Sequence, residues 1–136
     1  MLIRHKGFVE YELPDGWESE VNGENVIIFD PNGEGAMVMS FYRSTGDMPI
    51  EKRIYKMAQS FVEQIMIKQL SDFSESNDNR RVFRVCCEGI DANNLYIKLY
   101  IIAKSPRIVV ATYNNKIKNH EIETYNEIVK SMKPLA

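Results

Sequence analysis

Short connections between strand-like stretches constrain the fold of this chain more than any other feature. Asn22-Gly23 separates two such stretches, residues 17–21 and 26–29. This dipeptide favours a type I′ hairpin because both of its residues tolerate positive φ. Further turns are predicted over residues 30–33, 91–94 and 105–106. Because parallel neighbours need a crossover of about a dozen residues or more, these connections predict a mostly antiparallel sheet.

Alternation of apolar and polar residues marks the strands that these turns join. The predicted strands cover residues 8–13, 17–21, 26–29, 36–43, 81–88, 95–104 and 107–113. The stretch 95–104 has the clearest pattern, since every second residue from Leu95 to Ala103 is apolar and would face the same side. The stretch 107–113, RIVVATY, is apolar on both faces, which predicts a central strand covered on both sides.

Two helices are predicted from apolar residues that recur at steps of three and four. The first would be capped by Thr45 or Asp47, and its apolar stripe consists of Ile50, Ile54, Met57, Ala58, Phe61 and Ile65. Its last turns, QIMIKQL (64–70), are apolar nearly all round, so they are predicted to be deeply buried or to form a contact patch. The second helix covers residues 120–133, and Pro134 ends it.

The predicted order is therefore four strands, a helix, three strands and a helix, with the polar stretch 71–81 as a loop. Both amphipathic helices need a surface on which to bury their apolar stripes, and the faces of the sheet offer it. We predict one α+β domain over residues 1–136. Its twisted antiparallel sheet would have about six or seven strands, with the two helices packed on it.

A short motif in the first third of the chain suggests a family. A strand ends in YELPDGW, with Pro14, Gly16 and Trp17 at the centre of the motif, and NVIIFDPNGEGAMVMSFY follows. With its long helix, three strands and closing helix, this order resembles the PsbP-like superfamily over nearly the whole chain. The resemblance implies an α/β/α sandwich and a non-catalytic binding or adaptor module, because characterised members act by holding other proteins. Pro14 would preset a turn, and Trp17 would begin the next strand as an apolar anchor.

Charge and hydropathy argue against several classes of protein. The formal charge of −2 gives no electrostatic reason to expect nucleic acid or an anionic membrane as a partner. No apolar run approaches the roughly 20 residues needed to cross a bilayer. The first residues lack the apolar stretch of a secretory signal. Cys86 and Cys87 are adjacent and are therefore predicted to be reduced. Together these features predict a cytoplasmic protein.

The sequence contains no pattern typical of a catalytic, metal or cofactor site. His5 and His120 have no metal-ligating neighbours at the usual spacing. Cys86 and Cys87 would point to opposite faces of a strand, so we interpret them as small buried residues, with a redox switch as the alternative. The glycine pair at 33–35 leads into a strand rather than a helix, which argues against a phosphate loop. We predict no catalytic residue, no metal and no cofactor.

One strand face is a candidate interaction surface. Tyr96, Lys98 and Tyr100 alternate on one strand, and Arg84 and Glu88 alternate on the strand before it. If the two faces coincide, aromatic stems and charged tips would form a mixed patch typical of interfaces. The alternative interpretation is that these long side chains cover the sheet while their polar ends reach water.

These observations predict a cytoplasmic, non-catalytic protein-binding module of the adaptor or chaperone type. Its partner would be another protein or a second copy of the chain, held by the strand face above or by the apolar end of the first helix. The alternative is a small-ligand binder or a hydrolase with its site between sheet and helix. A deep cavity lined by titratable groups with perturbed pKa values would favour that alternative.

Overall fold

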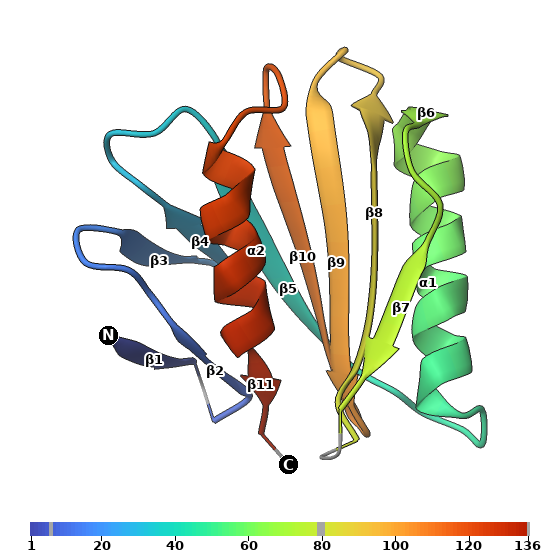
Figure 1. Cartoon of the computed structure of the whole chain (residues 1–136). Helices are drawn as coiled ribbons and strands as arrows, with labels where there is room; N and C mark the ends of the chain where they lie inside the picture. The colour runs from blue at the N-terminus through green and yellow to red at the C-terminus, as the bar shows by residue number, and fades with distance from the viewer. Residues whose placement is uncertain (6, 79–80, 136) are drawn as a thin grey trace.

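A computed structural model describes residues 1–5, 7–78 and 81–135. Its main sheet has eight strands in the order β3-β4-β5-β10-β9-β8-β6, with β7 also paired to β8, and its neighbouring strands pair antiparallel (Figure 1). The strands are β3 (Glu18–Asn22), β4 (Asn25–Phe29), β5 (Ala36–Arg43), β6 (Met66–Gln69), β7 (Ser74–Asn77), β8 (Phe83–Asp91), β9 (Tyr96–Lys104) and β10 (Arg107–Asn115). The prediction of an antiparallel sheet is confirmed.

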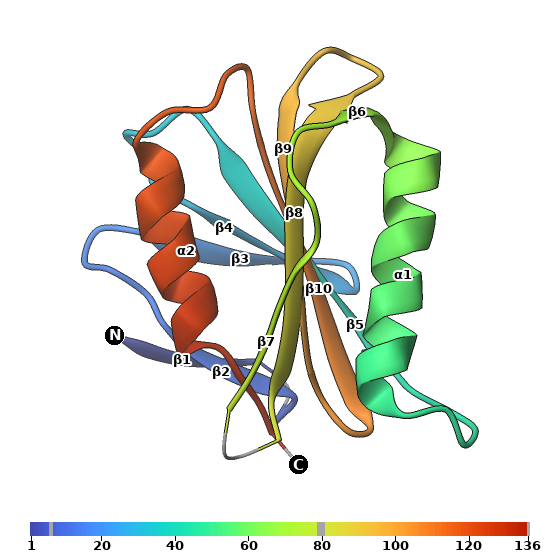
Figure 2. The ribbon, with the colours of Figure 1, turned by 45° about the vertical axis from the view of Figure 1, so that its right-hand side comes forward.

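The two helices lie on opposite faces of this sheet. Helix α1 (Ile50–Ile65) covers one face and helix α2 (Glu121–Ser131) the other, as the two views in Figures 1 and 2 show. Each helix packs its apolar stripe on its own core, so the sheet is the central layer of an α/β/α arrangement. The α+β class predicted from the sequence is confirmed.

The centre of the sheet follows the apolar pattern of its strands. Strand β10 lies between β5 and β9 and is covered on both sides, as the stretch RIVVATY predicted. On β9, the residues from Ile97 to Ala103 at every second position pack against α1. The intervening residues Tyr96, Tyr100 and Ile102 belong to the core under α2. Strand β9 therefore contributes to both cores.

A second, three-stranded sheet contacts the main one at its central strands β9 and β10. It consists of β1 (Leu2–His5), β2 (Val9–Glu12) and β11 (Lys133–Pro134), in the order β1-β2-β11. The predicted strand 8–13 therefore belongs to this small sheet, not to the main one. The turn after it closes with Trp17 N–H donating to the Pro14 carbonyl at 3.1 Å. Trp17 then packs its ring 4.9 Å from that of Tyr125 on α2, so it is an anchor between strand and helix.

Several local predictions around α1 are wrong. Neither Thr45 nor Asp47 caps the helix; Pro49 occupies the N-cap position and no side chain caps it. The helix ends at Ile65, and the following residues form β6, which pairs with β8. The predicted loop 71–81 contains β7; residues 79 and 80 lie outside the described part of the chain.

The sheet consequently has more strands than predicted. Strands β6 and β7 are short and mostly exposed, and neither has the alternation that marks a half-buried strand. They form because β8 offers backbone donors and acceptors along its outer edge. Neither helix in the described part of the chain is long and apolar enough to cross a membrane.

Candidate functional site

A cavity of about 590 Å³ lies between α2 and the strands β7, β8 and β9. Its floor comes from the β8 and β9 residues that face α2, among them Arg84, Cys86, Tyr100 and Ile102. Strand β7 forms one wall through its serines, and α2 forms the opposite wall. The cavity is therefore bounded by segments that are far apart in the sequence.

The register between β8 and β9 brings the sequence-predicted surface residues onto this floor. Arg84 pairs with Ile102, Cys86 with Tyr100, and Glu88 with Lys98. The two predicted faces therefore coincide. The structure nevertheless covers them with α2 and the segment before it, so that Tyr96 and Tyr100 are only 1% and 4% exposed. The rings of Tyr96 and Tyr100 belong to the core, and their hydroxyl groups form part-buried hydrogen bonds with other side chains.

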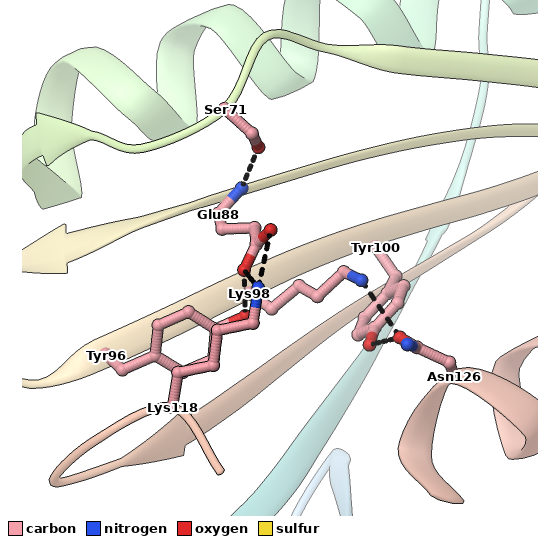
Figure 3. Close-up of polar contacts among 7 residues, drawn as sticks. All are labelled: Ser71, Glu88, Tyr96, Lys98, Tyr100, Lys118 and Asn126. Atoms are coloured by element: carbon pink, nitrogen blue, oxygen red, sulfur yellow. Dashed lines mark hydrogen bonds and ion pairs between the residues drawn. The ribbon is translucent and has the colours of Figure 1, made fainter. Parts of the chain in front are cut away.

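A hydrogen-bond cluster joins the floor of the cavity to α2 (Figure 3). The Lys98 ammonium donates to Asn126 Oδ1 at 2.9 Å, and the Tyr100 hydroxyl donates to the same oxygen. Burial raises the pKa of Tyr100, and the nearby groups of Cys86 and Glu88 raise it further. Tyr100 therefore remains a protonated donor at neutral pH.

A second cluster surrounds Glu88, which lies opposite Lys98 in the register between β8 and β9. Its carboxylate accepts a hydrogen bond from Tyr96 and lies 2.8 Å from the Lys118 ammonium, while its backbone N–H donates to Ser71 Oγ at 2.9 Å (Figure 3). Burial alone would raise the pKa of Glu88. The bonds from Lys118 and Tyr96, together with the charges of Lys118 and Lys98, outweigh burial and lower it. Glu88 is therefore ionised at neutral pH.

Arg84 attaches the floor of the cavity to the end of α2. Its guanidinium donates to the Met132 carbonyl at 3.1 Å and lies 3.6 Å from the Asp78 carboxylate. Carbonyl groups in the last turn of a helix lack intrahelical partners and carry partial negative charge, so a cation there is stabilising. Arg84 therefore positions α2 over the sheet.

The two cysteines separate as predicted. Cys87 packs in the core under α1 and is 1% exposed, and burial, followed by the nearby groups of Cys86 and Glu88, raises the pKa of its thiol to about 11. Cys86 is half-buried on the other face, in the middle of the cavity floor. Both thiols are free. Within the described residues, no three His, Cys, Asp or Glu side chains gather as a metal site.

The sequence alone did not predict which side chains form hydrogen bonds and ion pairs with Lys98, Tyr100 and Glu88. Asn126, Lys118 and Ser71 complete the two clusters, and each comes from a segment remote from β8 and β9. Asn126 directly follows Tyr125, a member of the apolar stripe of α2, and only the packing of that helix turns it toward Lys98. No periodic signal in the sequence marks such a contact.

Comparisons with known proteins show the fold. No family model matches the chain, and no curated protein matches it. The solved structures that are similar include PsbP (CyanoP) from Synechocystis, with a TM-score of 0.65 and 10% identity over 96% of this chain and 89% of that one. A protein from Bacteroides thetaiotaomicron has a TM-score of 0.59 and 10% identity, and the match covers 98% of this chain but 47% of that one.

A third similar structure is PA94 of Pseudomonas aeruginosa, described as a protein of unknown function and a candidate regulator. It has a TM-score of 0.55 and 18% identity over 93% of this chain and 91% of that one. Identities this low show a shared architecture, and they assign no role to individual residues of this chain. The resemblance predicted from the motif around Trp17 is thus confirmed at the level of architecture, and the chain has a PsbP-like α+β fold.

Proposed function

We propose that the protein is a non-catalytic binding module that holds a small organic ligand in the cavity between α2 and β7–β9. The observation that carries this proposal is the cavity itself. Its volume of about 590 Å³ lies in the range of small-molecule sites, roughly 300–1,000 Å³. It also combines an apolar floor with a few polar groups that converge from different elements, which is the usual composition of such sites.

The titratable groups around the cavity favour binding over catalysis. Tyr100 lines it and Glu88 adjoins it, and both have perturbed pKa values. The Tyr100 hydroxyl donates a hydrogen bond to Asn126, and the Glu88 carboxylate forms an ion pair with Lys118. Neither described histidine lines the cavity, so the Cys86 thiol has no imidazole base beside it there. These groups therefore organise a binding site instead of an acid–base pair.

The neutral dye N-phenyl-1-naphthylamine tests this proposal, because its fluorescence rises when it enters an apolar site. We expect saturable binding to the wild-type protein at one site. Cys86→Phe would fill the middle of the cavity floor and abolish the signal. The matched control is Val21→Phe, which places the same ring on the exposed edge strand β3. Absence of saturable binding, or equal binding by Cys86→Phe, would contradict the proposal.

A second candidate function is binding of another protein or a second copy of the chain at the β6 edge. Strand β6 ends the main sheet, so its outer backbone groups are free to pair with an added strand. Ile67 in β6 is 67% exposed, and Leu70, which directly follows β6, is 47% exposed, whereas Met66 is buried. Ile67 and Leu70 belong to the stretch 64–70, which the sequence predicted to be either deeply buried or a contact patch, and their exposure argues against deep burial.

Light scattering across a concentration series tests the β6 edge for self-association. A dimer that Ile67→Lys dissociates would support it, and Ile117→Lys, a change at an equally exposed residue outside β6, is the control. A monomer at every concentration would refute self-association. We propose a cytoplasmic location for either function, supported by the free neighbouring thiols Cys86 and Cys87.

A further inference from the structure

We propose that the cavity selects amphipathic ligands that carry a carboxylate group, and that Lys98 and Asn126 bind this carboxylate. The inference rests on the proposed function, since it assigns a ligand class to the same cavity. An apolar ligand body would lie over Ile102, Cys86 and Val129, and the carboxylate would face the end of the cavity near Lys98. The inference is based on the surplus of hydrogen-bond donors and of positive charge at the Lys98 end of the cavity.

The orientation of Asn126 is set by its neighbours. The Lys98 ammonium can only donate a hydrogen bond, so the amide atom that it meets at 2.9 Å must be the oxygen. Tyr100 donates to the same oxygen. The Asn126 amide nitrogen consequently points elsewhere, and it has no hydrogen-bond partner among the described residues. Two N–H groups of the Asn126 amide and two of the Lys98 ammonium are therefore available to donate hydrogen bonds to an acceptor on a ligand.

The charge on Lys98 has no carboxylate counterpart at ion-pair distance within residues 1–5, 7–78 and 81–135. Glu88 is its neighbour across the strands, but Lys118 holds the Glu88 carboxylate at 2.8 Å, with a hydrogen bond from Tyr96. Lys98 is half-buried, so part of its hydration is lost. An anionic ligand would supply both the charge and the acceptor that this position lacks.

The remaining charges around the cavity leave this end positive. Arg84 is engaged by the Met132 carbonyl and by Asp78. On the rim, Lys130 pairs with Glu127 at 3.2 Å, and both side chains are 72% exposed. Glu123 is an exposed rim residue on α2 whose charge water screens. Lys98 is thus a half-buried cation of the cavity lining with no ion-pair partner among the described residues. Arg84 is the other half-buried cation there; its two terminal nitrogens contact Asp78 and the Met132 carbonyl, and its Nε has no hydrogen-bond partner in the described part of the chain.

Displacement of N-phenyl-1-naphthylamine by octanoate and by octanamide tests this specificity, because the two competitors differ in the charge of the headgroup. At pH 7.5 we expect octanoate to displace the dye at a concentration at least about tenfold lower than octanamide. Lys98→Met keeps the aliphatic stem and should remove this preference, with displacement by each competitor measured relative to the variant's own affinity for the dye. Asn126→Asp would place a carboxylate beside Lys98 and should remove the preference as well. Lys104→Met, on the same strand but outside the cavity, is the control.

The outcomes separate this inference from the proposal on which it rests. Dye binding with equal displacement by octanoate and octanamide refutes carboxylate selection and leaves the binding module intact. A preference that survives Lys98→Met also refutes it. Absence of dye binding to the folded wild-type protein refutes both. Melting curves for each variant show whether a lost preference reflects the site or a loss of folding, and a preference lost by Lys98→Met in a folded protein supports the inference.

Discussion

Replacing Glu88 with glutamine should lower the free energy of unfolding at pH 7 by about 2 kcal/mol. A hydrogen bond to a charged group, such as the one from Tyr96 to the half-buried Glu88 carboxylate, contributes roughly 1.5–3 kcal/mol. The Lys118 side chain is 55% exposed, so its ion pair adds only roughly 0.2–1 kcal/mol. Glutamine would keep a neutral hydrogen bond with Tyr96, worth about 1 kcal/mol, and the difference gives the expected loss.

The loss should depend on pH in a defined direction. Because the pKa of Glu88 is lower in the folded protein than its ordinary value of 4.5, the unfolded chain takes up the extra proton as the pH falls below about 4.5. The stabilisation is therefore fully present at neutral pH and disappears as the pH drops through the folded-state pKa. The variant has no such carboxylate to protonate, so the two stabilities should converge in acid.

Urea unfolding at pH 7 and at several acidic pH values measures both effects. Glu127→Gln is the matched control, because its ion pair with Lys130 is 72% exposed on both sides and the change should stay within about 0.5 kcal/mol. Equal losses for the Glu88 and Glu127 variants at pH 7 would refute the assigned role of the Glu88 cluster. A difference from wild type that persists undiminished in acid would refute its electrostatic origin.

Three further changes probe the fold and the cavity. Gly35→Ala would place a Cβ 2.5 Å from the ring of Tyr113 and should destabilise the protein by roughly 1–3 kcal/mol in urea unfolding; an unchanged midpoint would contradict this packing. Trp17→Ala should cost about 2 kcal/mol, less than a fully buried tryptophan, and retained thermal stability would mark Trp17 as a recognition residue instead. A thiol reagent such as DTNB should label Cys86 in the native protein and Cys87 only after unfolding, and the dye should protect Cys86; two fast thiols would place Cys87 outside the core.

The sequence alone determined the local and periodic features of this protein. Asn22-Gly23 predicted the hairpin between β3 and β4, and RIVVATY predicted the covered central strand β10. The predicted type I′ turn at Asn22-Gly23 is wrong, because Asn22 pairs with Asn25, the loop residues are Gly23 and Glu24, and Gly23 has the positive φ while Asn22 does not. The apolar stripes of α1 and α2 and the opposite faces of Cys86 and Cys87 follow from the same reasoning. These features depend on turn chemistry and on repeats of two or 3.6 residues, which a chain displays before it folds.

Only the tertiary structure decided which elements meet. It placed residues 9–12 in a second sheet, added β6 and β7 along the edge of β8, and covered the Tyr96–Tyr100 face with α2. Asn126, which lines the cavity over that face, and Lys118, which pairs with Glu88, come from segments with no periodic link to it. Contacts between distant polar side chains arise from packing, and packing leaves no regular pattern in a single sequence.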